Sequence, residues 1–186
     1  MEKNDKFIDA PYTKVKPFAA RVGDCAKEHG YSGPIGSVLY GFRFLKNFYC
    51  NIIANIVPYS GLRVALHRFR GVTIGKDVLI GYNVTIDNIY PELVTIEDGV
   101  SLAGNNLILT HSKPLEYHKK VLKSYVAPVV IKKNAWITVG VTILAGVTIG
   151  NGSVIAAGSV VTKDIPDNCL AAGNPAKMIK ILEDNS

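Results

Sequence analysis

The most regular feature of the sequence is an aliphatic residue at every sixth position. Three uninterrupted runs carry this period, and they consist of Ile74, Ile80, Ile86; Ile96, Leu102, Ile108; and Ile131, Ile137, Ile143, Ile149, Ile155, Val161. Because Ile, Leu and Val make up a little over a quarter of the chain, six consecutive hits in the last run arise by chance about once in two thousand placements. The period therefore reflects the fold.

A six-residue period matches neither an α-helix, with about 3.6 residues per turn, nor a tight β-hairpin. It indicates a coil of short strands, in which three hexapeptides make one turn that pairs in parallel with the next. The repeats predict four coils, beginning at Ile74, Ile96, Ile131 and Ile149. Each coil buries its apolar face on its neighbours, as in other solenoids. We therefore expect a mainly β protein, folded as a parallel β-helix of hexapeptide repeats.

Two breaks interrupt the repeat, a short one at residues 88–93 and a long one at residues 110–128. Long irregular loops are uncommon inside compact domains, and they usually carry function. We expect the aliphatic repeat positions to be core and the chemistry to lie at the breaks.

The residues ahead of the coils follow a helical period instead. Apolar residues recur at three- and four-residue steps at Val38, Phe42, Leu45, Tyr49, Ile52 and Ile56. This spacing predicts an amphipathic helix that Pro58 ends. A second helix is predicted from Ser60, as its N-cap, to Gly71. We expect both helices to cap the end of the β-helix, with contact to a membrane surface as the alternative.

At the other end of the chain, Asn174 and Pro175 predict the start of a short helix that runs through Leu182. The expected organisation is an N-terminal helical capping region over residues 1–71, a β-helix domain over 72–168 with an inserted loop at 110–128, and a C-terminal loop and helix over 169–186.

Composition narrows the functional classes only slightly. The chain is 48% hydrophobic and 19% charged, as in a globular protein. Its net charge of +6 suits an anionic ligand, but no basic run is interleaved with aromatic residues, so we expect no nucleic-acid binding. Cys25, Cys50 and Cys169 are widely spaced and predict free thiols. The first residues contain no apolar stretch typical of a secretory signal, so we expect a cytoplasmic protein.

The later coils carry more specific motifs. The sequence contains THSKP in the long break, followed by AWITVGVTILAGVTIGNGSVIAAGSVVTKDIP and AAGNPAKMIKIL. Over roughly residues 71–182, this order of repeat, loop and motifs resembles the galactoside and maltose O-acetyltransferase branch of the hexapeptide-repeat acyltransferases. The resemblance implies a left-handed coil whose stacked turns form a triangular prism. It also implies a homotrimer with active sites in clefts between the prisms of neighbouring subunits. It also implies acetyl-CoA as co-substrate and no metal.

The same resemblance implies roles for individual residues. His111, at the base of the long loop, is implied as the general base, because a sugar hydroxyl is a poor nucleophile at neutral pH and imidazole can accept its proton. The positions that match contacts to the pantetheine arm are Trp136, Val139 and Ala157, with the Val139 amide as a donor to the thioester oxygen. The positions near the 3′-phosphate and adenine are Thr162, Lys163, Lys177 and Lys180.

The acceptor side departs from the family pattern, because the N-terminal region differs and the short break alters the early coils. Asn83 and Asp87 are the best polar candidates for binding a saccharide. We expect acetyl transfer to a sugar hydroxyl, while an N-acyltransferase acting on an amino sugar or nucleotide sugar and a non-catalytic β-helix scaffold stay open. A γ-type carbonic anhydrase needs three zinc-binding histidines on adjacent coils, and only His111 lies at a coil edge. The sequence therefore argues against this class of enzyme.

Overall fold

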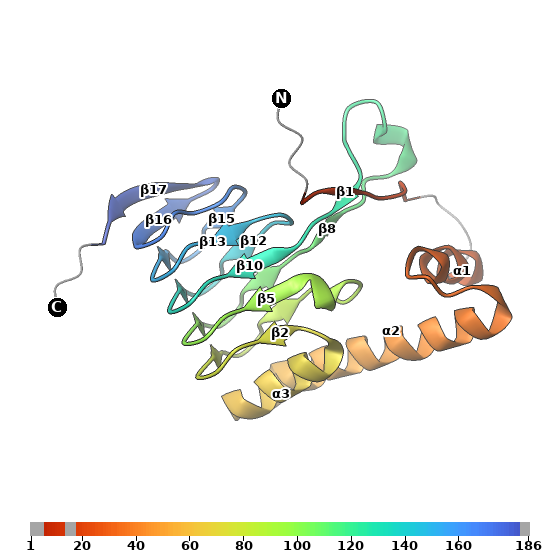
Figure 1. The fold of residues 1–186 in the computed structure, drawn as a ribbon, viewed down its shortest axis with the longest axis horizontal. Helices are drawn as coiled ribbons and strands as arrows, with labels where there is room; N and C mark the ends of the chain where they lie inside the picture. The colour runs from red at the N-terminus through yellow and green to blue at the C-terminus, as the bar shows by residue number, and fades with distance from the viewer. Residues whose placement is uncertain (1–5, 14–17, 183–186) are drawn as a thin grey trace.

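The computed structural model describes residues 6–13 and 18–182. Three sheets of parallel strands form the walls of a prism (Figure 1). The first wall contains β2 (Thr73–Ile74), β5 (Val94–Ile96), β10 (Val129–Ile131) and β13 (Thr148–Ile149). The second contains β3 (Leu79–Ile80), β6 (Ser101–Leu102), β11 (Trp136–Ile137) and β14 (Val154–Ile155). The third contains β4 (Thr85–Ile86), β7 (Leu107–Ile108), β12 (Thr142–Ile143) and β15 (Val160–Val161).

The register of these sheets confirms the predicted coils. Ile74 pairs with Ile96, Ile96 with Ile131, and Ile131 with Ile149, so the first positions of all four coils lie in one ladder. Eleven of the twelve repeat aliphatics are at most 1% exposed, and together they form the core. Ile74, in the first strand of the first coil, is only partly buried.

The C-terminal segment differs from the prediction, because it forms strands instead of a helix. The stack continues beyond the fourth coil, where Ile165 bridges to Ile149 and β16 (Cys169–Gly173) adds to β14 in parallel. The chain then reverses, and β17 (Ala176–Ile181) pairs antiparallel with β16. A helix there would leave the backbone groups on the edge of β16 without these partners. The edge of the last coil therefore prevails over the local helix-start signal.

In the part of the chain that the structure describes, three helices precede the coils: α1 (Phe18–Glu28), α2 (Gly33–Ile56) and α3 (Ser60–Arg70). The predicted helices correspond to α2 and α3, and Gly71 ends α3 in a left-handed conformation with φ 111°. The N-cap of α3 is Tyr59 and not Ser60. The Ser60 hydroxyl instead accepts a hydrogen bond from the Ile80 N–H at 2.9 Å, which links α3 to the first coil.

Helix α3 covers the open edge of the first coil with three arginines. Arg68 donates to the carbonyl of Ile74 at 3.0 Å, and Arg63 donates to that of Ile80 at 2.7 Å. Arg70 donates to the carbonyl of Ile86 at 2.8 Å. Each strand of the first coil thus has one arginine on its outward carbonyl, which satisfies backbone acceptors that no preceding coil could pair.

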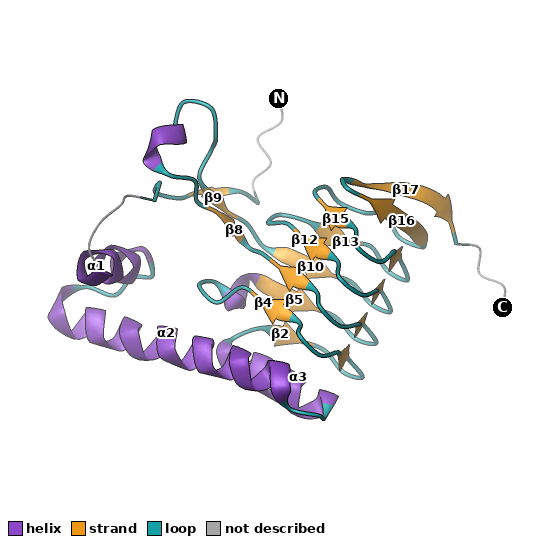
Figure 2. Cartoon of the chain, turned by 180° about the vertical axis from the view of Figure 1, so that it is seen from behind, coloured by secondary structure: helices purple, strands orange, loops and turns teal. Residues whose placement is uncertain are grey.

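Helix α2 lies along α3 and extends beyond the prism (Figure 2). Its predicted apolar stripe does not face the coils. Each of the six stripe residues is at least 43% exposed, whereas the buried side carries Tyr40, Asn47, Cys50, Asn51 and Ala54. The period correctly predicted a helix but not the face that packs, because Asn47 and Arg70 create a polar interface at the end of the prism. No helix in the described ranges combines the length and apolarity needed to cross a membrane.

The long break forms a small separate sheet above the coils. It contains β8 (His111–Ser112) and β9 (Tyr125–Val126), joined by a loop with a short 3-10 helix at Glu116–His118. Strand β1 (Ile8–Asp9) adds antiparallel to β9. The short break carries another 3-10 helix, Pro91–Leu93. Both breaks therefore lie on the side of the prism that α1 and α2 approach (Figure 2).

Candidate active site

His111 and Asp87 form a close pair at the edge of the third wall. Asp87 follows β4 directly, and His111 follows β7 after two residues, so the pairing of these strands brings the side chains together. The distance from His111 Nδ1 to Asp87 Oδ2 is 2.6 Å. An ionised carboxylate only accepts hydrogen bonds, so Nδ1 carries a proton, and in the neutral imidazole Nε2 keeps the lone pair. The histidine side chain is 23% exposed and lines a cavity, described below.

The Asp87 carboxylate is held by backbone donors as well as by His111. Its Oδ1 accepts the N–H groups of Ile89 at 2.8 Å and Tyr90 at 3.2 Å, and its Oδ2 accepts that of Thr110 at 3.0 Å. Burial alone would raise the pKa of Asp87, but the hydrogen bonds from His111 and from these amides outweigh it and hold the pKa far below its usual range. The carboxylate is therefore charged at neutral pH.

A buried arginine supports the backbone beneath this carboxylate. Arg70 Nη2 donates to the Asp87 carbonyl at 2.8 Å and to Asn88 Oδ1 at 2.7 Å, while Nη1 lies 2.9 Å from His67 Nδ1. Burial lowers the pKa of Arg70 to about 10, so it stays protonated. Burial, reinforced by Arg70, lowers the pKa of His67 to about 3. His67 is therefore neutral, and its Nδ1 accepts a hydrogen bond from Arg70 Nη1.

Side chains from α1 and both breaks surround the exposed side of the pair. The Tyr90 ring centroid is 5.9 Å from that of His111, and the ring of His29 stacks on Tyr90 at 4.6 Å. Lys113 forms an ion pair with Glu28 and donates to the Tyr90 hydroxyl at 2.6 Å. No sequence pattern predicted roles for these four residues. Tyr90 and Lys113 lie in the two breaks of the repeat, where function was expected, so their positions could have pointed to the site. Glu28 belongs to α1, a helix that no sequence pattern predicted.

A cavity of about 640 Å³ adjoins His111. Helix α1 contributes Val22 and Cys25 to its wall, and α2 contributes Tyr40, Gly41, Phe44 and Leu45. The two breaks contribute Ile89, Lys113 and His111 itself. The volume is in the range of small-molecule sites. Two segments that are distant in sequence, the N-terminal helices and the loop at 110–128, thus enclose one space beside the candidate base.

The two predicted acceptor residues have different surroundings. Asn83 occupies an exposed corner with φ 56°, and its amide donates to Asn105 Oδ1 in the next coil at 3.2 Å. Asp87 is buried, and both of its oxygens already accept from several donors, including His111. The structure places Asp87 against the candidate base, and the acceptor roles of both residues stay predictions.

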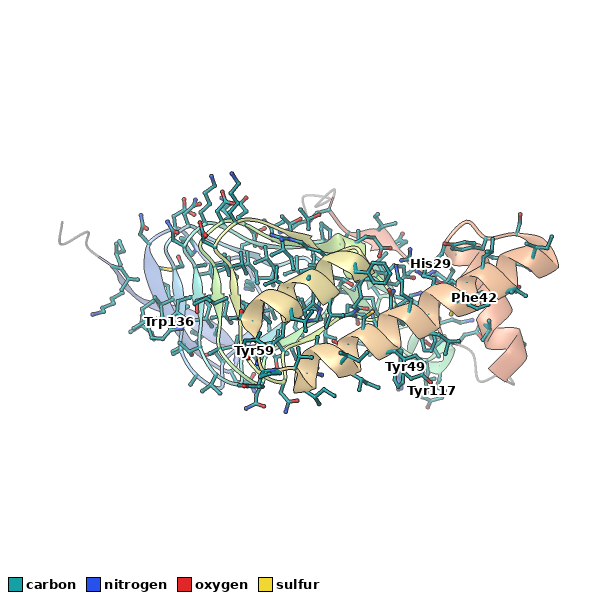
Figure 3. All side chains as sticks on the ribbon, turned by 90° about the horizontal axis from the view of Figure 1, so that it is seen from below. His29, Phe42, Tyr49, Tyr59, Tyr117 and Trp136 are labelled. Carbon is teal, nitrogen blue, oxygen red and sulfur yellow. The ribbon has the colours of Figure 1, made fainter. Side chains whose placement is uncertain are left out.

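The predicted donor-site residues lie elsewhere on the chain. Trp136 is 51% exposed on the second wall, and Val139, in the turn that follows β11, is 47% exposed. Figure 3 shows Trp136 on the later coils, well separated from His29, whose ring stacks on Tyr90. The exposed positions Ala157, Thr162, Lys163, Lys177 and Lys180 lie on or after β14, β15 and β17. A single chain thus does not bring Trp136 to His111, and the cofactor assignments stay predictions. Within the described residues, no three His, Cys, Asp or Glu side chains are placed to hold a metal ion.

Comparisons with known proteins match most of the chain but not all of it. The family model "Bacterial transferase hexapeptide (six repeats)" matches residues 128–163. The galactoside O-acetyltransferase of Escherichia coli is 41% identical over 114 residues, which cover 61% of this chain. A Staphylococcus aureus protein, named an acetyltransferase without a stated substrate, is 36% identical over 161 residues and is matched over 83% of this chain and 96% of its own length. The chain spans only 55% of the E. coli enzyme and 54% of a Schizosaccharomyces pombe relative.

A solved structure extends the similarity to a cofactor complex. A hexapeptide-repeat acetyltransferase from Vibrio cholerae, complexed with acetyl-CoA, superposes with a TM-score of 0.63 at 26% identity, over 78% of this chain and 90% of that one. The parallel sheets and this neighbour are consistent with a left-handed β-helix. Together with the 36% identity over nearly the full length of the S. aureus protein, they show that this chain belongs to the hexapeptide-repeat acetyltransferase family.

Proposed function

We propose that the protein transfers the acetyl group of acetyl-CoA to a hydroxyl of a saccharide, with His111 as the general base. The observation that carries this proposal is the 2.6 Å pair between His111 Nδ1 and the buried Asp87 carboxylate. It leaves Nε2 as a proton acceptor at the edge of a cavity. The acetyl-CoA complex of the V. cholerae relative and the galactoside activity in the name of the E. coli relative support the choice of donor and acceptor.

The reaction follows from this geometry. Nε2 of His111 takes the proton of the acceptor hydroxyl while its oxygen attacks the thioester carbonyl. The tetrahedral intermediate then collapses, the C–S bond breaks, and the imidazolium returns the proton to the leaving CoA thiolate. The products are an acetyl ester and free CoA. Asp87 holds the imidazole in the reactive tautomer and stabilises its charged form during the transfer.

For the donor side, we propose a homotrimer in which a neighbouring prism completes the site. Trp136, Val139 and Ala157 contact the pantetheine arm, and the Val139 amide donates to the thioester oxygen. Thr162, Lys163, Lys177 and Lys180 lie along the 3′-phospho-ADP portion. The separation of Trp136 from the His111 pair within one chain (Figure 3) supports this division, because donor and base meet only if two chains contribute.

The test is acetyl-CoA-dependent release of free thiol, measured with a panel of neutral saccharides and amino sugars. We expect saccharide-dependent release by the wild type and almost none by His111→Ala. Release that depends only on amino sugars, with the acetyl group recovered as an amide, would replace the proposal with N-acetylation. Absence of release and of acetyl-CoA binding would favour a scaffold role.

A further inference from the structure

The cavity beside His111 is lined mainly by apolar groups, which is unexpected for a site that binds an unsubstituted sugar. Its lining includes the apolar side chains of Val22, Phe44, Leu45 and Ile89. Saccharides carry many hydroxyls, and a site that recognises them needs free donors and acceptors. We propose that the acceptor carries an apolar alkyl or isoprenoid-like chain, and that this chain occupies the cavity while the reacting hydroxyl lies at His111. The inference rests on the proposed acyl transfer and names its acceptor class.

The other polar side chains of the lining already have hydrogen-bond or ion-pair partners. Thr13 Oγ1 donates to the Lys113 carbonyl at 3.0 Å, and Lys113 pairs with Glu28. The hydroxyl of Tyr40 is hydrogen-bonded to Cys25, and Tyr40 is only 5% exposed. Among the polar side-chain atoms of the described lining residues, His111 Nε2 is the one for which the structure shows no hydrogen-bond partner. One reacting hydroxyl and an apolar body match this lining better than a ring of hydroxyls.

The cavity also has an apolar exit. Phe44 and Leu45 line it, and they are 39% and 47% exposed. Both belong to α2, whose outward stripe of apolar side chains continues along the helix. Because both side chains line the cavity and are exposed, a chain longer than the cavity can continue past them onto the apolar stripe of α2. The same helix thus provides both the wall and the exit.

The first experiment compares two acceptors that differ only in the chain. Methyl and octyl β-D-galactopyranoside are titrated into the wild type in the presence of CoA, below the micelle concentration of the octyl compound. Each methylene that enters an apolar site improves binding roughly fourfold. We expect the octyl compound to bind at least tenfold more tightly. Binding of the two compounds within twofold of each other, or no binding of the octyl compound, overturns the inference.

The second experiment fills the cavity. A Cβ at Gly41 meets no atom within 4 Å, so Gly41→Leu introduces a side chain into open space on α2. Glycine is a poor helix former, so the melting temperature should stay the same or rise. We expect octyl galactoside binding to fall at least tenfold, with acetyl-CoA binding unchanged. The matched control is Gly61→Leu, at an exposed site on α3 that also has no atom within 4 Å.

A third pair separates the cavity from the outer surface of α2. Phe44 lines the cavity, whereas Phe42 on the same helix is 67% exposed and does not. Phe44→Ala should remove most of the octyl preference, and Phe42→Ala should keep it. Equal losses in the two variants would mean that the chain binds the open helix surface, and would overturn the inference.

Failure of this inference and failure of the proposed function give different results. Acetylation of methyl galactoside with no octyl preference leaves the acyl transfer standing and removes the chain-binding cavity. Tight octyl binding without thiol release from any hydroxyl acceptor supports the cavity and removes the transfer.

Discussion

The sharpest test of the catalytic pair is Asp87→Asn. Oδ1 of Asp87 accepts two backbone N–H groups, from Ile89 and Tyr90, so the asparagine carbonyl oxygen will occupy that place. The amide nitrogen then replaces Oδ2 and faces His111 Nδ1 and the Thr110 N–H. Since this nitrogen can only donate, it forces His111 into the tautomer with the proton on Nε2. Nε2 of His111 then has no lone pair with which to accept the proton of the acceptor hydroxyl.

The magnitude follows from what the base supplies. General-base catalysis typically contributes about 10²- to 10⁴-fold, or roughly 3 to 5 kcal/mol of transition-state free energy. We expect kcat to fall by about that factor in both Asp87→Asn and His111→Ala. The asparagine variant also leaves the buried Thr110 N–H without its acceptor, which should lower the free energy of unfolding by about 1 to 3 kcal/mol. The affinity for acetyl-CoA should change by less than about threefold, because the substitutions remove no predicted donor contact.

The assay is a double-mutant cycle on kcat, read as thiol release at saturating acetyl-CoA. If Asp87 acts only by orienting His111, then adding Asp87→Asn to His111→Ala should cause little further loss. An additional loss as large as in the wild-type background would refute this reasoning. A raised acceptor KM with unchanged kcat in Asp87→Asn would instead support Asp87 as a ligand of the acceptor.

Three further predictions concern the donor site, the assembly and stability. Lys163→Ala and Lys177→Ala should raise the KM for acetyl-CoA more than they change kcat, because a contact to the remote phosphate stabilises the bound substrate and the transition state equally. Equal KM values for acetyl-CoA and its dephospho form in the wild type would argue against such a contact. Sedimentation should show a trimer, and a stable, fully active monomer would contradict the shared site. The pKa of His67 is 6.5 in the unfolded chain and about 3 in the folded protein, so between these pH values the unfolded state binds a proton that the folded state does not. The free energy of unfolding therefore falls as pH drops below about 6.5, by roughly 3 kcal/mol at pH 4.5. His67→Gln should reduce this pH dependence in urea unfolding measured at pH 7 and pH 4.5, and an unchanged dependence would assign the acid sensitivity to other groups.

The sequence alone determined the coils, because their signal is local and repeated. An aliphatic residue at each sixth position specifies both the buried side chain and the parallel partner, and the ladder from Ile74 to Ile149 follows this register. The position of His111 at a break was also readable. The expected alignment of the first two coils pairs Ile86 with Ile108, and this pairing brings Asp87, which follows Ile86, close to His111 in the next coil.

Only the tertiary structure decided which surfaces meet. The signal at Asn174 suggested a helix, but the open edge of β16 offers a strand more hydrogen bonds than a short helix would retain. The apolar stripe on α2 predicted a helix, yet buried Asn51 bonds to Arg70 and turns the polar face inward. Tyr90, Lys113 and α1 converge on His111 through contacts between residues far apart in the chain. A local period carries no information about such partners, because they depend on which backbone acceptors and charges the folded coils leave unpaired.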